Sequence, residues 1–169
     1  VNLIALSGDF ALSPGNITIK SQTGDFVSNA VTQIFNWKIG HLVGFVQTDE
    51  VNAIVVSGDF ALSASSEGTI KVWNWQTRKE IRTLAEHTGK LTRLTLSGEF
   101  VASNSDKTIK VWNWQTGEVF CTFTESEDRF LDFSLLEDVI AMVTPNNIVQ
   151  VWNWRTGNAL YSHENSEDS

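Results

Sequence analysis

The sequence predicts an all-β fold built from four repeats, each forming one four-stranded antiparallel sheet. Three observations support this. A tryptophan-bearing motif recurs four times, a turn motif recurs in phase with it, and short runs rich in Val, Ile, Leu and Thr between them have the composition of β-strands. A chain of 169 residues, 41% of them hydrophobic, is long enough to bury a core of this kind.

Two motifs recur along the chain with one spacing. The first reads Phe35-Asn36-Trp37, Trp73-Asn74-Trp75, Trp112-Asn113-Trp114 and Trp152-Asn153-Trp154, and its second tryptophans are 38, 39 and 40 residues apart. The second reads Ser7-Gly8-Asp9-Phe10, Ser57-Gly58-Asp59-Phe60, Ser97-Gly98-Glu99-Phe100 and, more weakly, Leu136-Glu137-Asp138-Val139. We expect the tryptophans to be core residues: Trp37, Trp73, Trp75, Trp112, Trp114, Trp152 and Trp154.

The third repeat shows its strands most clearly. Residues 91–96, 100–103, 108–114 and 119–123 are the expected strands, and Gly98 can take the positive φ that a tight hairpin turn requires. Extending this pattern predicts units at residues 1–47, 48–85, 86–124 and 125–162, followed by an acidic polar tail at 163–169.

The segment Thr108-Ile109-Lys110-Val111-Trp112-Asn113-Trp114 resembles the third strand of a WD40 repeat, with Asn in place of the usual Asp. The resemblance covers nearly the whole chain and implies the blades of a β-propeller. It also implies a structural hydrogen-bond chain in the third repeat, made by His87, Ser103, Asp106 and Trp112. The second repeat has Glu67 in place of the aspartate and the fourth has Asn146-Asn147, so we expect those blades to be less rigidly tied.

Four repeats are fewer than the roughly six to eight blades that the resemblance implies for a closed ring. Each blade buries both faces against its neighbours, so an open arc of four would leave an apolar face bare at each end. Three arrangements would cover these faces: further repeats of a longer chain, a second copy that completes an eight-bladed ring, or a cramped four-bladed closure.

The first repeat carries an insertion between its second and third strands. Gly8 to Trp37 spans 29 residues, whereas the corresponding spacing is 17 in the second repeat and 16 in the third. Pro14-Gly15 predicts a turn, residues 16–20 alternate like a strand, and residues 22–25 predict a hairpin turn. The insertion is either a surface loop without a binding role or a hairpin that contacts a partner through Pro14, Asn16, Lys20, Asp25 and Phe26.

The third position of each first strand varies between repeats and reads Leu3, Ala53, Arg93 and Asp132. First strands line the central channel in the fold that the resemblance implies. Arg93 and Asp132 would therefore lie on adjacent blades near the channel, where they either form an ion pair or offer polar contacts to a bound peptide.

The sequence offers little for catalysis. His41, His87 and His163 lack metal-ligand spacing, and Cys121 stands alone in a strand pattern. No glycine-rich loop opens a helix, so no phosphate site is predicted. We therefore expect a non-catalytic protein without a cofactor, and a propeller hydrolase or lyase is the alternative.

Charge and cysteine content narrow the choice of partners. Residues 1–117 carry 10 basic and 10 acidic side chains, whereas residues 118–169 carry 2 and 10, so the net charge of −8 belongs to the C-terminal part. This distribution disfavours nucleic acid and anionic membranes, and no apolar run approaches the roughly 18 residues that span a bilayer. A single cysteine suits a reducing compartment, and we expect the cytoplasm.

These observations predict an interaction scaffold or recognition module of WD40 type that belongs to a larger regulatory or signalling protein. Its partners would be other proteins, together with further blades of the same chain or a second copy. A half-propeller completed by homodimerisation is the structural alternative.

Overall fold

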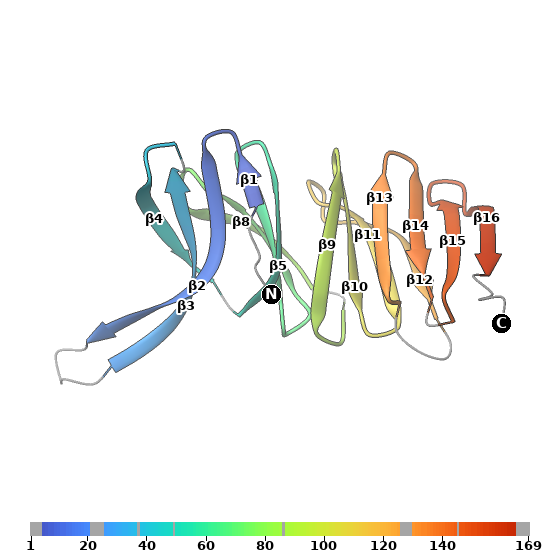
Figure 1. Cartoon of the computed structure of the whole chain (residues 1–169), viewed down its shortest axis with the longest axis horizontal. Coiled ribbons are helices and arrows are strands. Elements are labelled where there is room, and N and C mark those ends of the chain that lie inside the picture. Colours follow the sequence, from blue (N-terminus) through green and yellow to red (C-terminus); the bar gives the residue numbers. More distant parts are fainter. Residues whose placement is uncertain are drawn as a thin grey trace, which may run out of the picture.

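The computed structural model consists of four antiparallel sheets that stand side by side in an open row (Figure 1). It describes residues 5–20, 26–36, 38–48, 50–85, 87–125, 130–144 and 146–164. No helix occurs within these ranges, and each sheet is a meander whose four strands follow one another in sequence order. The predicted fold class, four four-stranded all-β units, is therefore confirmed.

The strands lie close to the predicted positions. The first sheet holds β1 (Ala5–Ser7), β2 (Phe10–Lys20), β3 (Phe26–Asn36) and β4 (His41–Gln47), and the second holds β5 (Val51–Ser57), β6 (Phe60–Ser65), β7 (Ile70–Asn74) and β8 (Lys79–Leu84). The third holds β9 (Leu91–Ser97), β10 (Phe100–Ser105), β11 (Thr108–Asn113) and β12 (Val119–Thr124). The fourth holds β13 (Asp132–Leu136), β14 (Val139–Val143), β15 (Ile148–Asn153) and β16 (Asn158–Glu164), so β16 enters the segment expected as a tail.

One tight turn joins the first and second strands of every sheet. Its second residue has φ of 55° at Gly8, 56° at Gly58 and 57° at Gly98, the left-handed conformation that favours glycine. The fourth sheet keeps the same backbone with a different residue, since Glu137 has φ of 49°. The geometry of the turn is thus repeated even where the glycine is absent.

The second tryptophan of each described motif ties the third strand to this turn. Its indole nitrogen donates to the carbonyl oxygen of the left-handed residue: Trp75 to Gly58 at 3.0 Å, Trp114 to Gly98 at 3.0 Å and Trp154 to Glu137 at 2.8 Å. A buried indole N–H needs a partner, and this carbonyl supplies it without leaving the sheet. Tryptophan and turn therefore recur together for a physical reason.

The asparagine between the aromatic residues closes the next turn. Its side-chain oxygen accepts from a backbone N–H three residues on: Thr77 to Asn74 at 2.8 Å, Thr116 to Asn113 at 3.0 Å and Thr156 to Asn153 at 2.9 Å. The bond closes a turn through a side-chain oxygen that asparagine and aspartate both carry. Asparagine in place of the family's usual aspartate therefore keeps the turn.

Each junction between neighbouring sheets is an apolar layer. The phenylalanine that begins the second strand of one sheet packs on the second tryptophan of the next, with ring centroids 5.0 Å apart for Phe10 and Trp75, 5.4 Å for Phe60 and Trp114, and 4.6 Å for Phe100 and Trp154. Three separate core clusters lie between consecutive sheets. The fold is therefore a stack of sheets joined by one repeated interface.

The insertion of the first repeat lengthens two strands. β2 and β3 pair without interruption from Phe10 with Asn36 to Lys20 with Phe26, and this hairpin projects from the row (Figure 1). Pro14, predicted at a turn, instead lies inside β2 and pairs with Thr32. The described part of β1 pairs with β2 from Phe10 to Leu12.

Candidate functional site

A chain of hydrogen bonds crosses the third sheet beneath its loop end. The Trp112 indole nitrogen donates to the Ser103 hydroxyl at 2.8 Å, and that hydroxyl lies 2.8 Å from His87 Nε2. His87 Nδ1 lies 3.3 Å from the Thr108 hydroxyl, which donates to the Ser105 carbonyl oxygen at 3.1 Å. The chain thus connects the incoming loop, the second strand and the third strand.

Only one protonation state satisfies every member of this chain. Ser103 receives the Trp112 proton and gives its own to His87 Nε2, while Nδ1 keeps its hydrogen and donates to Thr108. A protonated imidazole would instead point a second donor at Ser103. Burial, together with the nearby Lys110 ammonium, lowers the pKa of His87 to about 4, against the opposing effect of Asp106.

Asp106 is placed beside this chain. It sits in the turn between β10 and β11 with φ of 42°, and its carboxylate lies against Gly89, where an added Cβ would collide with Oδ2. Its contribution to His87 is the electrostatic one described above. The ring nitrogen that faces away from Ser103 contacts Thr108, a residue that the motif comparison does not single out.

The fourth sheet lacks the serine that anchors this network. Met142 occupies the register position of Ser103, and the Trp152 indole nitrogen donates to Gln150 at 3.1 Å within its own strand. Trp152 is only partly buried, whereas Trp73 and Trp112 are buried and donate to Ser63 and Ser103. The remaining tryptophans of the predicted core, Trp75, Trp114 and Trp154, are buried, and Trp37 lies outside the described residues.

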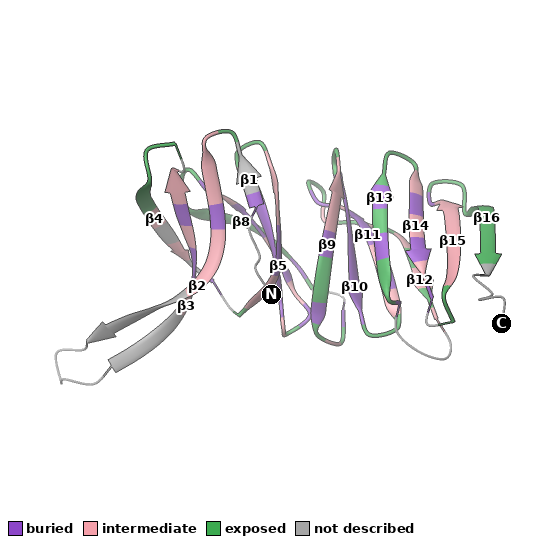
Figure 2. Ribbon diagram, viewed as in Figure 1, coloured by how far each residue is buried: buried purple, intermediate pink, exposed green. Residues whose placement is uncertain are grey.

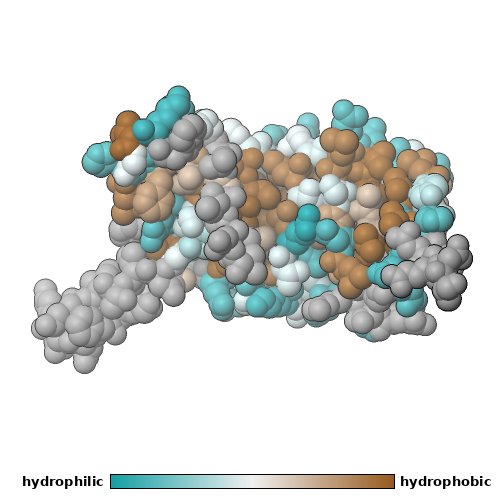
Figure 3. Space-filling model, in the orientation of Figure 1, coloured by the Kyte–Doolittle hydropathy of each residue, from teal (hydrophilic) through white to brown (hydrophobic). Residues whose placement is uncertain are grey.

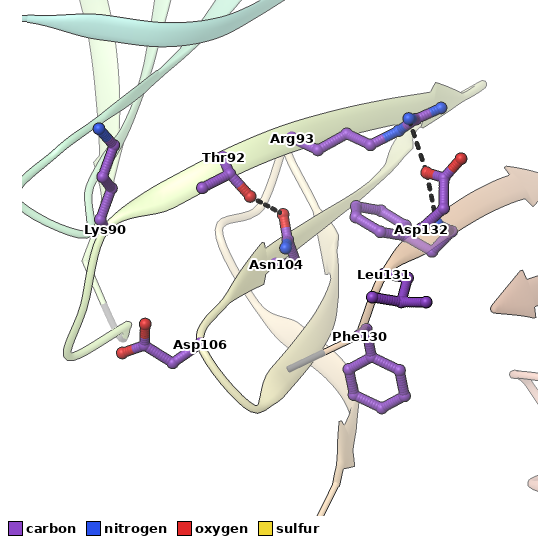
Figure 4. A pocket seen from close by; sticks show the side chains of 9 residues that line it. Lys90, Thr92, Arg93, Asn104, Asp106, Phe130, Leu131 and Asp132 are labelled. Carbon is purple, nitrogen blue, oxygen red and sulfur yellow. Dashed lines mark hydrogen bonds and ion pairs between the residues drawn. The ribbon is translucent and has the colours of Figure 1, made fainter. Parts of the chain in front are cut away.

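A pocket opens where the third and fourth sheets meet (Figure 4). Its volume is about 420 Å³, within the range of ligand-binding clefts. Its walls come from the start of β9, the end of β10 with the turn that follows, and the link that enters β13; the lining residues are Lys90, Thr92, Arg93, Asn104, Asp106, Phe130, Leu131, Asp132 and Phe133.

The predicted pair of first-strand residues forms part of this pocket. Arg93 Nη1 lies 2.6 Å from Asp132 Oδ1, and the guanidinium also sits 5.9 Å from the centre of the Phe133 ring. Both charged side chains are about half exposed, so the pair contributes little to folding stability and stays accessible. The ion pair bridges two blades at a place that a partner can reach.

The other walls combine charge with apolar surface. Lys90 and Asp106 carry opposite charges on the side of the pocket away from the Arg93–Asp132 pair (Figure 4). Leu131 is 53% exposed beside the buried Phe130. An exposed leucine next to polar groups of both signs suits recognition of a polypeptide segment more than of a simple ion.

Sequence reasoning identified only part of this pocket. Arg93, Asp132 and Asp106 stand out in the repeats, whereas Leu131 and Phe130 lie in a link that has no repeated motif. Their signal is indirect, since they immediately precede the variable first-strand residue Asp132. The assembly of the walls depends on how neighbouring sheets pack, which motif spacing does not reveal.

The residues proposed in the first-repeat insertion are placed by the backbone alone. Pro14, Asn16 and Lys20 lie in β2 and Phe26 begins β3, whereas Asp25 lies outside the described residues. The hairpin projects away from the third and fourth sheets (Figure 1), so it does not line the pocket.

The described residues contain no cluster of three or more His, Cys, Asp or Glu side chains able to hold a metal ion. Nor does this part of the chain contain a helix long and apolar enough to cross a membrane. Cys121 lies partly buried at the edge of the core between the third and fourth sheets, and burial raises the pKa of its thiol to about 11. Such a thiol is a poor nucleophile near neutral pH.

The fold and the pocket together define a protein made of propeller blades, with a partner-accessible cleft between two of them. Comparison with known families gives the more specific assignment. The family described as "WD domain, G-beta repeat" matches residues 36–74 and 78–113. Each matched segment begins with the outer strand of one sheet and ends with the third strand of the next. These two segments contain WD40 repeats, as their motifs predict.

Solved structures share this architecture. A chain of the mitotic checkpoint complex matches with a TM-score of 0.76 at 16% identity over 99% of this chain. Two computationally designed proteins, Ika4 and Ika8, match at 21% identity with TM-scores of 0.75 and 0.73 over 90% and 96% of this chain. The chain covers 50% of the checkpoint chain, 89% of Ika4 and 61% of Ika8. No curated protein sequence matches it.

Proposed function

We propose that the chain is a non-catalytic recognition module that binds a segment of another protein in the pocket between its third and fourth blades. The pocket carries this proposal, because it joins an exposed leucine, a half-exposed ion pair and a cavity of about 420 Å³ on one surface. The two segments that match the WD40 repeat support binding of protein partners. The similar checkpoint chain belongs to a protein complex, which agrees with that class of function.

The chemistry of the pocket specifies the kind of segment that fits. An apolar side chain would pack on Leu131 and Phe133, which lie beside each other in the link and at the start of β13. Charged groups of the segment would meet Lys90 and Asp106 on the side of the pocket away from the Arg93–Asp132 pair (Figure 4). The pocket has cations and anions in equal number, so a segment carrying both signs complements it better than a uniformly charged one.

Panning a random peptide library against the purified chain would test the proposal. We expect enrichment of peptides that contain an apolar residue flanked by charges. Fluorescence anisotropy would then compare the wild type with Leu131→Asp, which places a charge under the apolar anchor. A loss of at least about tenfold in affinity, about 1.4 kcal/mol, is expected from removing one central contact.

Ile81→Asp is the matched control. Ile81 is 56% exposed on β8, about as exposed as Leu131, and does not line the pocket. Its substitution should leave peptide affinity unchanged. Equal binding by the Leu131→Asp variant and the wild type, or a library that yields no enriched peptide, would contradict the proposal.

We infer a cytoplasmic location for this module and a place within a larger regulatory or signalling protein. The single cysteine supports the first inference, because a chain of this size from an oxidising compartment commonly carries disulfides. The acidic C-terminal part supports a protein rather than a nucleic-acid partner.

A further inference from the structure

A second cavity lies where the first and second sheets meet, and we call it the first-junction cavity. Its volume is about 320 Å³, and its lining residues are Phe10, Ile34, Val43, Trp75, Gln76 and Arg78. None of them lines the pocket between the third and fourth sheets. Its walls come from two sheets of this chain that share a core cluster, so the cavity belongs to an internal junction and not to an end of the row.

One wall of the cavity is the aromatic pair that recurs at every junction. The Phe10 and Trp75 rings lie 5.0 Å apart. At the third junction the matching pair, Phe100 and Trp154, is in contact with a further ring. That ring belongs to Phe120 of β12, whose centroid lies 5.8 Å from the first and 5.2 Å from the second. A phenylalanine of the outer strand therefore covers the aromatic pair at the third junction.

The first sheet carries a smaller residue at the position of Phe120. Strands β4 and β12 each contain a one-residue bulge, and the bulged residue is Val43 in β4 and Phe120 in β12. Valine lacks the ring that covers the aromatic pair, so the space remains as the first-junction cavity. Val43 is 48% exposed, and the turn from β3 into the start of β4 is exposed as well (Figure 2). The cavity can therefore be reached from solvent.

A charged residue reaches this cavity from a turn that glycine forms in the other sheets. Arg78 has φ of 61°, and the corresponding Gly40, Gly117 and Gly157 have φ of 67°, 87° and 75°. The left-handed conformation is strained for a residue with a side chain, and strain of this kind is concentrated at functional sites. The Arg78 side chain crosses to the first sheet, where Nη2 donates to the Val43 carbonyl oxygen at 3.1 Å.

Gly44 on β4 makes room for this guanidinium. Its φ lies outside the left-handed region, so the backbone does not require glycine here. The register places Arg82, Cys121 and Tyr161 at the same position of the other sheets. A Cβ at Gly44 would collide with the Arg78 guanidinium. Gly44 and Arg78 therefore depart from the repeat together, at the place where they touch.

The charge of the cavity favours an anion. Arg78 is the charged member of the lining, and its bond to the first sheet uses one of the five N–H donors of a guanidinium. The carboxylates nearest in sequence to the lining already have partners. Asp9 pairs with Lys38 at 2.7 Å, and Asp59 accepts a hydrogen bond from Gln76 at 2.7 Å. The planar guanidinium thus has donors left for a carboxylate in the cavity.

The rest of the lining favours a flat apolar body. The rings of Phe10 and Trp75 offer aromatic surface, and Ile34 and Val43 add aliphatic walls. In the space-filling view, brown apolar residues lie beside teal hydrophilic ones over the turn between β3 and β4 (Figure 3). The volume of about 320 Å³ is at the lower end of the range for ligand-binding clefts, which suits a small molecule better than a polypeptide segment.

We propose that the first-junction cavity binds a small aromatic carboxylate. Its ring would pack on Phe10 and Trp75, and its carboxylate would accept hydrogen bonds from Arg78. Three departures from the repeat meet at this place: the small Val43, the side-chain-free Gly44 and the strained Arg78. The ligand would sit between two blades, at a junction other than the one proposed to bind a protein segment.

Naphthoate and naphthylmethanol are matched probes, because they share one ring system and only the first carries a charge. Heteronuclear NMR would follow the assigned indole N–H signals during titration up to about 5 mM of each probe. We expect a saturable shift of the Trp75 signal and none of the Trp154 signal, because Phe120 covers the ring of Trp154. Naphthoate should bind at least about tenfold more tightly than naphthylmethanol, since only its charge is bonded by Arg78.

Three variants locate the bound probe. Val43→Phe copies the third sheet and should fill the cavity, which abolishes the shifts with both probes. Arg78→Gly copies the turn of the other sheets and should lower the affinity for naphthoate at least about tenfold, while the affinity for naphthylmethanol stays the same. Arg82→Ala is the matched control, because Arg82 is an exposed arginine of the same sheet outside the lining, and it should change neither affinity.

A purely structural role for Arg78, as a tie between two sheets, would leave the naphthoate affinity of Arg78→Gly equal to that of the wild type and would overturn the proposal. Equal wild-type affinities for the two probes, undiminished binding by Val43→Phe, or an unmoved Trp75 signal would also overturn it. Urea unfolding would establish that each variant is folded. Leu131→Asp should leave naphthoate binding unchanged, so failure of this site and failure of the protein-binding pocket would be seen separately.

Discussion

Glu137 is the one non-glycine residue in a turn that the other three sheets build with glycine, and replacing it should stabilise the protein. Its φ of 49° matches the values of 55–57° at Gly8, Gly58 and Gly98. The backbone bonds of the turn do not involve its side chain, since Ser97 accepts from Glu137 N and Trp154 donates to Glu137 O. Glu137→Gly would therefore remove strain and keep these bonds.

The expected gain follows from two opposing terms. A non-glycine residue in the left-handed region costs about 1–2 kcal/mol, and relief of this cost favours the glycine variant. Glycine also gives the unfolded chain more conformational freedom, which lowers the free energy of unfolding by about 0.5–1 kcal/mol. The net increase in the free energy of unfolding is about 0.5–1 kcal/mol, or roughly 1–4 °C in Tm for a chain of this size.

Urea unfolding followed by tryptophan fluorescence would measure this change. Glu137→Ala is the control, because alanine removes the charge but keeps the strain and should bring no gain. The reciprocal substitution Gly98→Glu should lower the free energy of unfolding by about 1 kcal/mol or more. If Glu137→Ala stabilises the protein as much as Glu137→Gly, the effect comes from charge and the strain argument fails.

Three further changes probe the internal network. Because the pKa of His87 is lowered to about 4, the unfolded chain binds a proton between pH 6.5 and 4 that the folded chain does not. The free energy of unfolding should therefore fall on acidification through this window, by about 3 kcal/mol at most. A His87→Gln variant whose free energy of unfolding changes with pH as in the wild type would contradict this. Gly68→Ala should destabilise the protein by about 1–3 kcal/mol in urea titrations, because Gly68 has φ of 83° and an added Cβ would lie 2.6 Å from the His87 carbonyl oxygen. Trp112→Phe should lower the free energy of unfolding by about 2–3 kcal/mol and Trp152→Phe by about 1 kcal/mol or less. The reason is that only the Trp112 indole is fully buried and bonded across strands to Ser103. Equal losses of stability in melting experiments would show that the two environments are equivalent.

Much of the fold could be predicted because its signals are local. In the third repeat, the expected strands at residues 91–96 and 108–114 correspond to Leu91–Ser97 and Thr108–Asn113, and the glycine assigned to the turn, Gly98, has the positive φ that was expected. These elements depend on the alternation of apolar and polar residues along a strand and on the residue types in the turns, and both are visible in adjacent residues of the sequence. Pro14 was misplaced because its conformation is set by pairing with Thr32 of β3, a contact between distant residues that local turn chemistry does not show.

The pocket was only partly predictable because it is a property of packing between sheets. Arg93 and Asp132 stood out as departures from an apolar position, and the structure brings them to 2.6 Å. Leu131 belongs to no motif, and its exposure follows from the path of a link between two blades. Thr108 completes the His87 chain through a ring nitrogen, a geometric relation that spacing alone does not give.

Positions that recur in every repeat and positions that vary between repeats have different physical roles. The fourth sheet shows the difference, because it keeps some of the recurring residues and replaces others. Some residues common to the repeats bond within one sheet, as Trp154 bonds to Glu137 O, and fix the shape of a blade, whereas the recurring phenylalanine packs on the next sheet. The fourth sheet keeps the bond between its second tryptophan and the turn. It replaces Ser103 by Met142, which removes the cross-strand bond to the first tryptophan, and the recurring phenylalanine by Val139. It also supplies Asp132 to the pocket. The proposed binding pocket therefore lies between the third blade, which keeps the repeated positions, and the fourth blade, which departs from them.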